Sequence, residues 1–449
     1  MAGLIQEVEL FGADMPRVEG LREKARAAFW LPTAKTEAWK YTKLHALKAD
    51  DFVVAPSKFL EEFEDEGEEG HCCCCDCHHE HNEECSCGHC HGEGEEHECG
   101  CCGKKHLPFA AYELHFENGK FVPIYPATPR GVEIMTLLEA VVTGEENHLL
   151  GKYIDYAKYP FAALNTAYLE EGLYIRIHKG VKLDKPLALI NHTQNGGENL
   201  LVNIRNLIVL EDGAKAELVE YFHYSGEAKS RYFNNIVNEI YLGTGAELDH
   251  CRYQNEAFKA VHIALSSVRI KSNGIYNGFC LQKGADLGRS ETQVRLLEKD
   301  AKAEVNAAYI MNGWATLDTT TDIEHLSSET YSSQLIKGVV GGEAKGVFQG
   351  KIHIAPDAQK TEGRQLHKAL LLSDDAEIDV KPELEIFADD VKCSHGAACG
   401  ELDKEQLFYM RSRGICEEEA KQLLIDAYLT DVIARVSDLT IREWLQNEI

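Results

Sequence analysis

The sequence predicts a mainly β fold, a β-helix of stacked short strands with helical regions at both ends. From about residue 172 to residue 388, short runs rich in Val, Ile, Leu and Tyr alternate with small turns, and helical periodicity is weak. In one recurring turn, Gly or an acidic residue precedes Ala and a strand follows, at Ala214, Ala246, Ala285, Ala301, Ala344, Ala358 and Ala376. The shortest gaps between these alanines are 14 to 18 residues, and the first gap and the longer ones are near multiples of that length. This spacing suits a solenoid with one turn per ~16–20 residues. A β-sandwich with irregular hairpins is the alternative.

The residue pattern outside the β-helix divides the rest of the chain into further regions. Residues 1–60 have apolar groups at helical spacing, including Val18, Leu21 and Ala25, and predict an N-terminal helical region. Residues 107–171 predict a mixed α/β region that starts with a hairpin turning at Asn118-Gly119. The β-helix core then covers 172–400, and 401–449 predicts a C-terminal helical domain with acids in its first turn and one apolar face.

The segment 61–106 is an acidic insertion rich in cysteine and histidine. It holds eleven of the sixteen cysteines and fifteen acidic residues against two lysines, and it has almost no aliphatic residues. We expect it to be disordered without metal. Paired C-x-x-C units and nearby imidazoles suit zinc, iron, nickel or copper, with the candidate ligands Cys72, Cys75, Cys77, His78, His81, Cys85, Cys87, His89, Cys90, His91, Cys99 and Cys102. The segment indicates a flexible metal sink or carrier; the alternative is a low-complexity insertion without a selected role.

Charge and composition exclude several classes of partner. The formal net charge is −28, and nearly half of the excess lies in the insertion, so the remainder is mildly acidic and does not predict binding to nucleic acid or to an anionic membrane. The N-terminus has no basic-then-apolar run and no stretch approaches the ~18 apolar residues of a membrane span. We therefore expect a cytoplasmic protein with reduced thiols.

Conventional catalytic motifs are missing from the sequence. There is no G-x-x-x-x-G-K-[ST] phosphate loop, no H-E-x-x-H and no G-x-S-x-G, so the sequence gives only weak support for a conventional enzyme. A second candidate site lies in "DDVKCSHGAACGELD", where Cys393 and His395 are two apart and point the same way if they share a strand. Two ligands are half a metal site, and spacing alone favours a packed cysteine beside a surface histidine.

Three stretches carry a resemblance to a known family. "LPTAKTEAWKYTKL" (31–44), "GVFQGKIHIAPDAQKTEG" (346–363) and the run from "LLLSDDAEIDVKPELEIFADDVKCSHGA" to "QLFYMRSRGI" (406–415) resemble the SufB/SufD family of iron–sulfur cluster assembly proteins. The resemblance covers nearly the whole chain except about residues 61–106. It favours the SufD branch, because Ala376 stands where SufB has a cluster-building cysteine and Gly396 follows His395 where SufB has a His-Glu pair.

The resemblance implies a right-handed parallel β-helix and a non-catalytic scaffold in an ATPase-driven complex. It implies pairing with a SufB-like subunit, and a transient iron–sulfur cluster at their interface that is held by His395, with Cys393 as a weaker candidate. It also implies that a SufC-like ATPase docks on the C-terminal helices, at Leu407, Phe408, Tyr409, Arg411, Arg413 and Gly414, although their pattern alone favours capping of the solenoid.

Several alternatives stay open at this point. The partner could be a second copy of the chain, giving a homodimer in place of a heterodimer. A metal-buffering or metallochaperone protein could use the insertion on a β-helix platform. A β-helix enzyme acting on a polysaccharide is a third possibility, and no motif predicts flavin binding.

Overall fold

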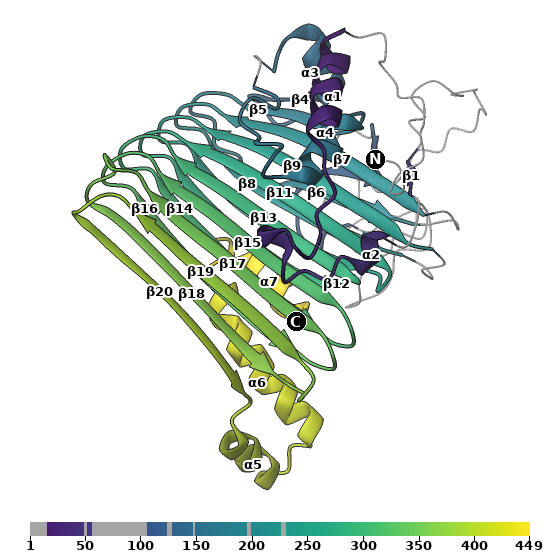
Figure 1. Cartoon of the computed structure of the whole chain (residues 1–449), viewed down its shortest axis with the longest axis vertical. Coiled ribbons are helices and arrows are strands. Elements are labelled where there is room, and N and C mark those ends of the chain that lie inside the picture. The colour runs from purple at the N-terminus through teal and green to yellow at the C-terminus, as the bar shows by residue number, and fades with distance from the viewer. Residues whose placement is uncertain are drawn as a thin grey trace, which may run out of the picture.

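The computed structural model describes residues 16–48, 52–55, 106–123, 128–146, 149–194, 199–225 and 230–449. Within these ranges the chain forms a parallel β-helix, with its strands stacked in two sheets that face each other (Figure 1). The solenoid predicted from the recurring turns is therefore confirmed, and the sandwich alternative is wrong. The insertion 61–105, with all twelve of the predicted metal ligands between Cys72 and Cys102, lies outside the described residues.

From residue 173 onward, successive strands alternate between two ten-stranded sheets. The first sheet contains β1 (Val53–Val54), β4 (Val132–Thr136), β5 (Leu173–Ile177), β7 (Leu200–Leu210), β9 (Tyr232–Leu242), β11 (Ala260–Ile270), β13 (Leu287–Leu296), β15 (Thr316–His325), β17 (Lys345–Ile354) and β19 (Glu377–Ile386). The second contains β2 (Tyr112–Glu117), β3 (Lys120–Val122), β6 (Leu187–Thr193), β8 (Lys215–Tyr224), β10 (Glu247–Glu256), β12 (Ile275–Gly284), β14 (Lys302–Met311), β16 (Tyr331–Val340), β18 (Thr361–Leu371) and β20 (Val391–Glu401). Among these strands, only β2–β3 and β4–β5 pair antiparallel.

The predicted period of the solenoid was wrong by a factor of about two. Leu287 pairs with Thr316, 29 residues later, and Lys345 pairs with Glu377, 32 residues later. A full turn contains one strand from each sheet, so the gaps of 14 to 18 residues between alanines correspond to half a turn. Counting one strand per turn in place of two caused the error.

The recurring Gly-Ala turn has a physical basis in the structure. Gly213 and Gly245 have φ of 70° and 66°, a left-handed conformation that a side chain disfavours. The alanines that follow, Ala214 and Ala246, are fully buried and face the interior. A larger side chain would not fit between the two sheets at these corners, which explains why the pattern is visible in the sequence.

The N-terminal region covers the outer face of the first sheet. It contains α1 (Pro16–Ala28), the 3₁₀ turn η1 (Glu37–Trp39), α2 (His45–Lys48), α3 (Leu137–Thr143) and α4 (Pro160–Ala167). Trp39 and Phe161 pack together over this face, in one apolar cluster with strand residues such as Val237 and Val261. The predicted hairpin is also present, since Asn118 and Gly119 both have positive φ between β2 and β3.

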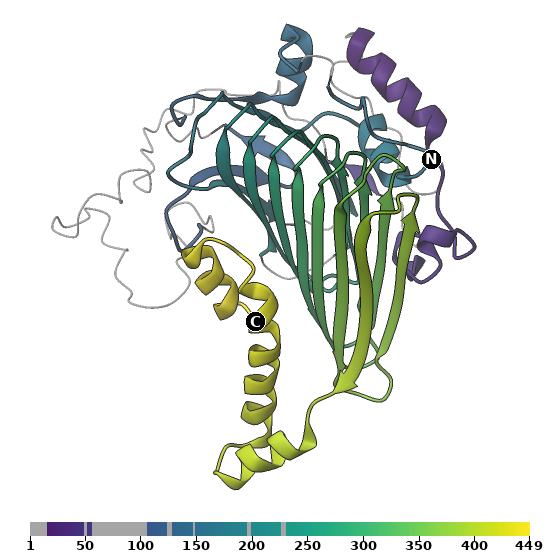
Figure 2. The ribbon, with the colours of Figure 1, turned by 90° about the vertical axis from the view of Figure 1, so that its left-hand side faces the viewer.

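The C-terminal helices cover the outer face of the second sheet. They are α5 (Lys404–Ser412), α6 (Glu417–Ile433) and α7 (Leu439–Asn447). Leu429 and Val432 of α6 and Trp444 of α7 are buried against strand residues such as Tyr221 and Tyr253. Figure 2 shows that α5 and the start of α6 extend beyond this packed part, so this end of the hairpin stands clear of the sheets.

Candidate functional site at the open end of the β-helix

The last turn of the β-helix has open edges. In the part of the chain that the structure describes, β19 pairs only with β17 and β20 pairs only with β18. Residues of β19 and β20 are mostly exposed or half-buried, whereas those of β15 and β16 are mostly buried. An edge strand with free N–H and C=O groups is a template for pairing with another strand. The end of the solenoid is therefore a surface suited to a partner.

Cys393 and His395 lie side by side on the inward face of β20. In the parallel register Cys393 is opposite Gly363 and His395 is opposite Gln365, and both of these β18 residues are buried. Cys393 packs against the apolar cluster that includes Ile352, whereas His395 is exposed because no further turn covers it. The prediction that both side chains point the same way is confirmed by this register.

The two side chains differ in their readiness to bind a metal. Partial burial raises the pKa of the Cys393 thiol, and the carboxylate of Glu362 raises it too, against a backbone hydrogen bond from Gly363 that lowers it. The thiol therefore stays protonated at neutral pH and must lose its proton before it can bind a cation. The imidazole of His395 is exposed, so a cation can reach it from solvent.

A second layer of polar side chains lies beneath His395, and sequence reasoning missed it. Gln365 is 3% exposed, and neither its amide nitrogen nor its amide oxygen has a hydrogen-bond partner among the described residues. His367, two residues further along β18, is fully buried and its Nε2 lies 2.8 Å from the hydroxyl of Tyr309. The alternation of Gly363, Gln365 and His367 in "EGRQLHKAL" is the signal that could have placed them on one inward face.

Apolar side chains are exposed at the rim of the same turn. Ile386 is 41% exposed and Phe387, in the corner between β19 and β20, is 61% exposed. Leu366 and Leu372 on the neighbouring strand and corner are 36% and 42% exposed. Large apolar groups gathered around an unpaired sheet edge are typical of an interface. Ala376 is buried in the corner before β19 and offers no ligand atom.

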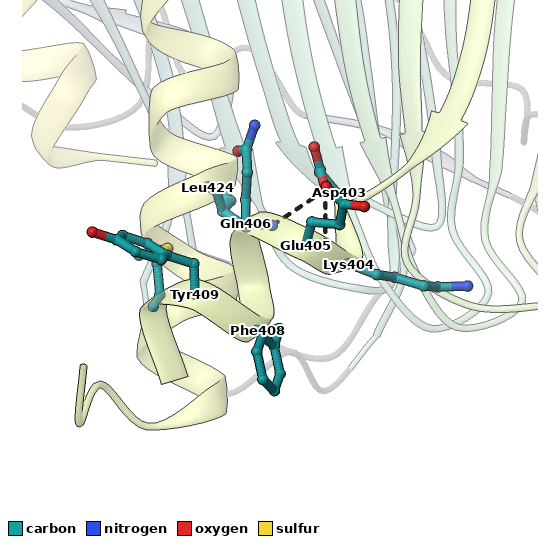
Figure 3. Close-up of a pocket in the computed structure, with 8 residues that line it drawn as sticks. Asp403, Lys404, Glu405, Gln406, Phe408, Tyr409 and Leu424 are labelled. Atoms are coloured by element: carbon teal, nitrogen blue, oxygen red, sulfur yellow. Dashed lines mark hydrogen bonds between the residues drawn. The ribbon is translucent and has the colours of Figure 1, made fainter. Parts of the chain in front are cut away.

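The six predicted docking residues lie on α5 and the turn after it. Phe408 is 74% exposed and Tyr409 is 59% exposed, and they line an open depression between α5 and α6 (Figure 3). The guanidinium of Arg413 lies 5.2 Å from the centre of the Tyr409 ring, and Arg411 pairs with Glu417 at 3.1 Å. Gly414 has φ of 92° and ends the turn. Leu407 is half-buried, and no residue of α5 is fully buried.

The local sequence explains why α5 and the start of α6 form without packing on the sheets. The carboxylate of Asp403 accepts hydrogen bonds from the backbone N–H groups of Glu405 and Gln406, which caps the first turn of α5 (Figure 3). The acids Glu417, Glu418 and Glu419 in the first turn of α6 favour the helix dipole. Local capping therefore holds a short helix whose aromatic side chains remain available.

Comparison with known proteins identifies the class to which this fold and site belong. The family model "SUF system FeS cluster assembly, SufBD core domain" matches residues 192–428. An iron–sulfur cluster assembly SufBD family protein of Synechocystis is 31% identical over 418 residues, which cover 90% of this chain and 84% of the relative. The iron–sulfur cluster assembly protein SufD of Escherichia coli is 27% identical over 415 residues, covering 92% and 87%. Protein ABCI7, chloroplastic, of Arabidopsis thaliana is 31% identical over 295 residues, covering 64% and 62%.

The chain therefore belongs to the SufBD family of iron–sulfur cluster assembly proteins. Within that family it is of the SufD type, and its role is in iron–sulfur cluster assembly. No helix among the described residues is long and apolar enough to cross a membrane.

Proposed function

We propose that the chain is a non-catalytic scaffold that builds a nascent iron–sulfur cluster at the open end of its β-helix, against a SufB-like subunit. His395 supplies one ligand there, and the partner supplies thiolate and carboxylate ligands. A SufC-like ATPase docks on the α5–α6 hairpin and its nucleotide cycle opens and closes the interface. A second copy of this chain is the alternative partner. The observation that carries the proposal is the exposed His395 in the last, uncovered turn.

The open end supports pairing with a subunit of the same architecture. β19 and β20 are the free edge strands of the two sheets, so a second β-helix can extend both sheets with backbone hydrogen bonds. Ile386 and Phe387 provide apolar area at the rim, where aromatic and aliphatic side chains contribute most to affinity.

The donor chemistry supports a shared cluster. One imidazole, beside a cysteine whose thiol stays protonated, cannot complete the coordination of even one iron ion, because cluster irons are held by thiolate or imidazole ligands in tetrahedral sites. Ligands from a second subunit must therefore complete the site. A cluster shared across an interface is also easily released when the interface opens, which suits a transfer scaffold.

The decisive experiment is anaerobic cluster reconstitution on the chain copurified with its SufB-like and SufC-like partners. We expect H395A to lower the rate or yield of cluster formation by about tenfold or more, because a ligand to the nascent cluster is lost. H395C should restore part of the activity, since a thiolate can replace the imidazole. Iron and sulfide content and the visible absorbance of the cluster give the readout.

A matched control separates ligation from damage to the interface. His353 lies on the outer face of β17 in the neighbouring turn and pairs with Glu385 at 3.1 Å, so H353A removes an imidazole that does not face the interior. H353A should form clusters as wild type does. Equal activity of H395A and wild type would refute the role of His395, and loss of complex formation in H395A would show that the side chain serves pairing instead.

A further inference from the structure

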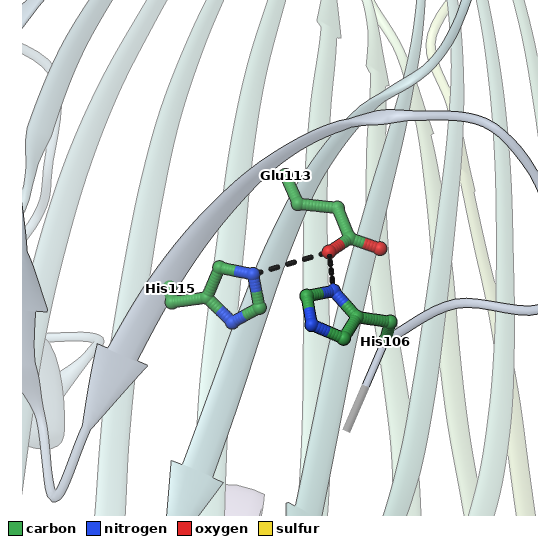
Figure 4. Close-up of side chains that lie close together, drawn as sticks. All are labelled: His106, Glu113 and His115. Carbon is green, nitrogen blue, oxygen red and sulfur yellow. Dashed lines mark hydrogen bonds and ion pairs between the residues drawn. The ribbon is translucent and has the colours of Figure 1, made fainter. Parts of the chain in front are cut away.

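Three metal-binding side chains converge on the outer face of the second sheet, at the opposite end from His395. The Nδ1 atom of His106 and the Nε2 atom of His115 lie 2.6 and 3.1 Å from the same carboxylate oxygen, Oε2 of Glu113. Figure 4 shows both rings turned toward this carboxylate. The candidate ligand atoms of the three residues all lie within 4.8 Å of one another.

The local fold holds the three side chains in place. Glu113 and His115 are two apart on β2, so they point to the same face of the sheet. His106 precedes a short segment that is fixed by apolar contacts, since Leu107 is buried and the ring of Phe109 meets Trp444 of α7 edge-on at 5.7 Å. The backbone N–H of Leu107 also donates to the other oxygen of Glu113 at 2.9 Å. The donors therefore come from a strand and an anchored segment, which is the arrangement that a preformed site requires.

The distances suit an ion after a small adjustment. Bonds of about 2.0–2.2 Å from a tetrahedral ion place its ligand atoms about 3.3–3.5 Å apart. The separations of 2.6 and 3.1 Å are slightly shorter than this, and all three ligand atoms lie within 4.8 Å of one another, so side-chain movements of a few tenths of an ångström to about one ångström bring them into range.

The donor set and its exposure point to a particular class of ion. Two imidazoles and one carboxylate suit first-row divalent metals such as Zn²⁺ and Fe²⁺, and they leave a coordination position for water or an exchanging ligand. Glu113 and His115 are mostly buried, with side-chain exposures of 15% and 11%, whereas His106 is 36% exposed. An ion can therefore enter from the side of His106 while the two inner ligands stay fixed.

We propose that His106, Glu113 and His115 form a binding site for a divalent transition-metal ion with an open coordination position. The site lies directly after the acidic cysteine-rich insertion in the sequence, with Cys102 four residues before His106. In the absence of the ion the carboxylate accepts hydrogen bonds from the two imidazoles; when the ion binds, the same two ring nitrogens present their lone pairs to it and each neutral ring carries its proton on the other nitrogen.

The test is a Zn²⁺ titration of the full-length apoprotein against a chromogenic chelator, with its accessible thiols capped by N-ethylmaleimide. We expect E113Q and H115Q each to bind about one ion fewer than wild type, because each removes a ligand from a three-ligand site. The control is H178Q, because His178 pairs with Glu133 at 2.9 Å without a second imidazole at that carboxylate, and it should bind as wild type does. Equal stoichiometry in all four proteins would overturn the proposal and leave a structural ion pair.

A second measurement keeps the proposal testable if the variants fold poorly. Crystals of the wild-type chain soaked in Zn²⁺ should show an anomalous difference peak bonded to the three side chains. A map without a peak at this position, in which Glu113 still contacts both imidazoles, would refute the site.

Discussion

Two buried histidines, His325 and His367, lie inside the last turns of the β-helix. His325 is fully buried and its two ring nitrogens lie 2.8 Å from the hydroxyls of Thr330 and Ser332. His367 stacks on Phe348 with ring centres 5.1 Å apart. Burial lowers the pKa of His325 to about 3, with a smaller contribution from His353, and burial lowers the pKa of His367 to about 4. Both imidazoles are therefore neutral in the folded protein.

This neutrality predicts a specific pH dependence of stability. In the unfolded chain the pKa of His367 returns to about 6.5, so below that pH the unfolded state binds a proton that the folded state does not. The contribution of His367 is thus fully present above pH 6.5 and is lost as the pH falls toward 4. A shift of this size corresponds to roughly 3 kcal/mol of unfolding free energy. In H367Q the decrease in unfolding free energy over this pH range should be smaller by about that amount, measured by urea unfolding.

The comparison needs a control for the loss of one imidazole. H178Q replaces a histidine outside the interior of the β-helix and controls for the loss of one imidazole. Carboxylates titrate in all three proteins and cancel in the difference. If H367Q runs parallel to wild type, the buried imidazole does not contribute to acid sensitivity.

At the scale of elements, the N-terminal stretch 31–44 fastens the helical region to the β-helix. Trp39 is buried, and the guanidinium of Arg289 on β13 lies 4.0 Å from its ring centre. Arg289 forms ion pairs with Glu291 and with Asp318 on β15. The hydroxyl of Thr42 donates to the same Asp318 carboxylate at 2.6 Å. This stretch therefore covers a charged row of the first sheet that would otherwise face water.

We expect W39A to release this stretch without unfolding the β-helix. Removing a buried Trp costs about 3–5 kcal/mol, whereas β13 and β15 keep parallel partners on both sides. Hydrogen exchange measured by mass spectrometry should then show faster exchange in peptides from 31–48 and little change in peptides from β13 and β15. W314A is the matched control, because Trp314 is 73% exposed. Equal loss of protection in the stretch and in the strands would contradict this separation.

The same elements show what the sequence could and could not predict. The recurring corners predicted a solenoid because a buried alanine returns at seven places where the chain changes sheet, after a left-handed glycine at Gly213 and Gly245. The spacing of the alanines did not reveal that one turn of the β-helix contains two strands, because both corners of such a turn use the same types of residue. Cys393 and His395 could be predicted because both belong to one short segment of the sequence. Gln365, His367 and Glu113 were missed because their significance depends on neighbours in the register or on a distant segment, which periodicity does not encode.

At the scale of the whole molecule, the candidate surfaces lie far apart. In the second sheet β2 and β20 are separated by eight strand spacings, so the Glu113 and His395 sites are roughly 38 Å apart. His106 thus lies at the end of the sheet remote from His395. An ion held by His106, Glu113 and His115 therefore does not share ligands with His395. The end of the hairpin formed by α5 and the start of α6 is a third surface, and it stands clear of both sheets (Figure 2).

This separation predicts that docking of the ATPase and pairing at the open end can be disrupted independently. Phe408 is 74% exposed at the tip of the hairpin, and truncating an aromatic anchor of an interface costs about 2 kcal/mol or more. F408A should therefore weaken binding of the SufC-like ATPase by roughly 30-fold or more, measured by biolayer interferometry. Pairing with the SufB-like subunit, measured by size-exclusion chromatography, should not change.

F258A is the matched control, because Phe258 is 72% exposed in the corner between β10 and β11, on neither surface. It should bind both partners as wild type does, since an exposed ring outside an interface contributes little to affinity. Equal ATPase affinity of F408A and F258A would place the docking surface elsewhere. Loss of pairing in F408A would mean that the hairpin and the open end act as one interface, since α5 follows directly on β20.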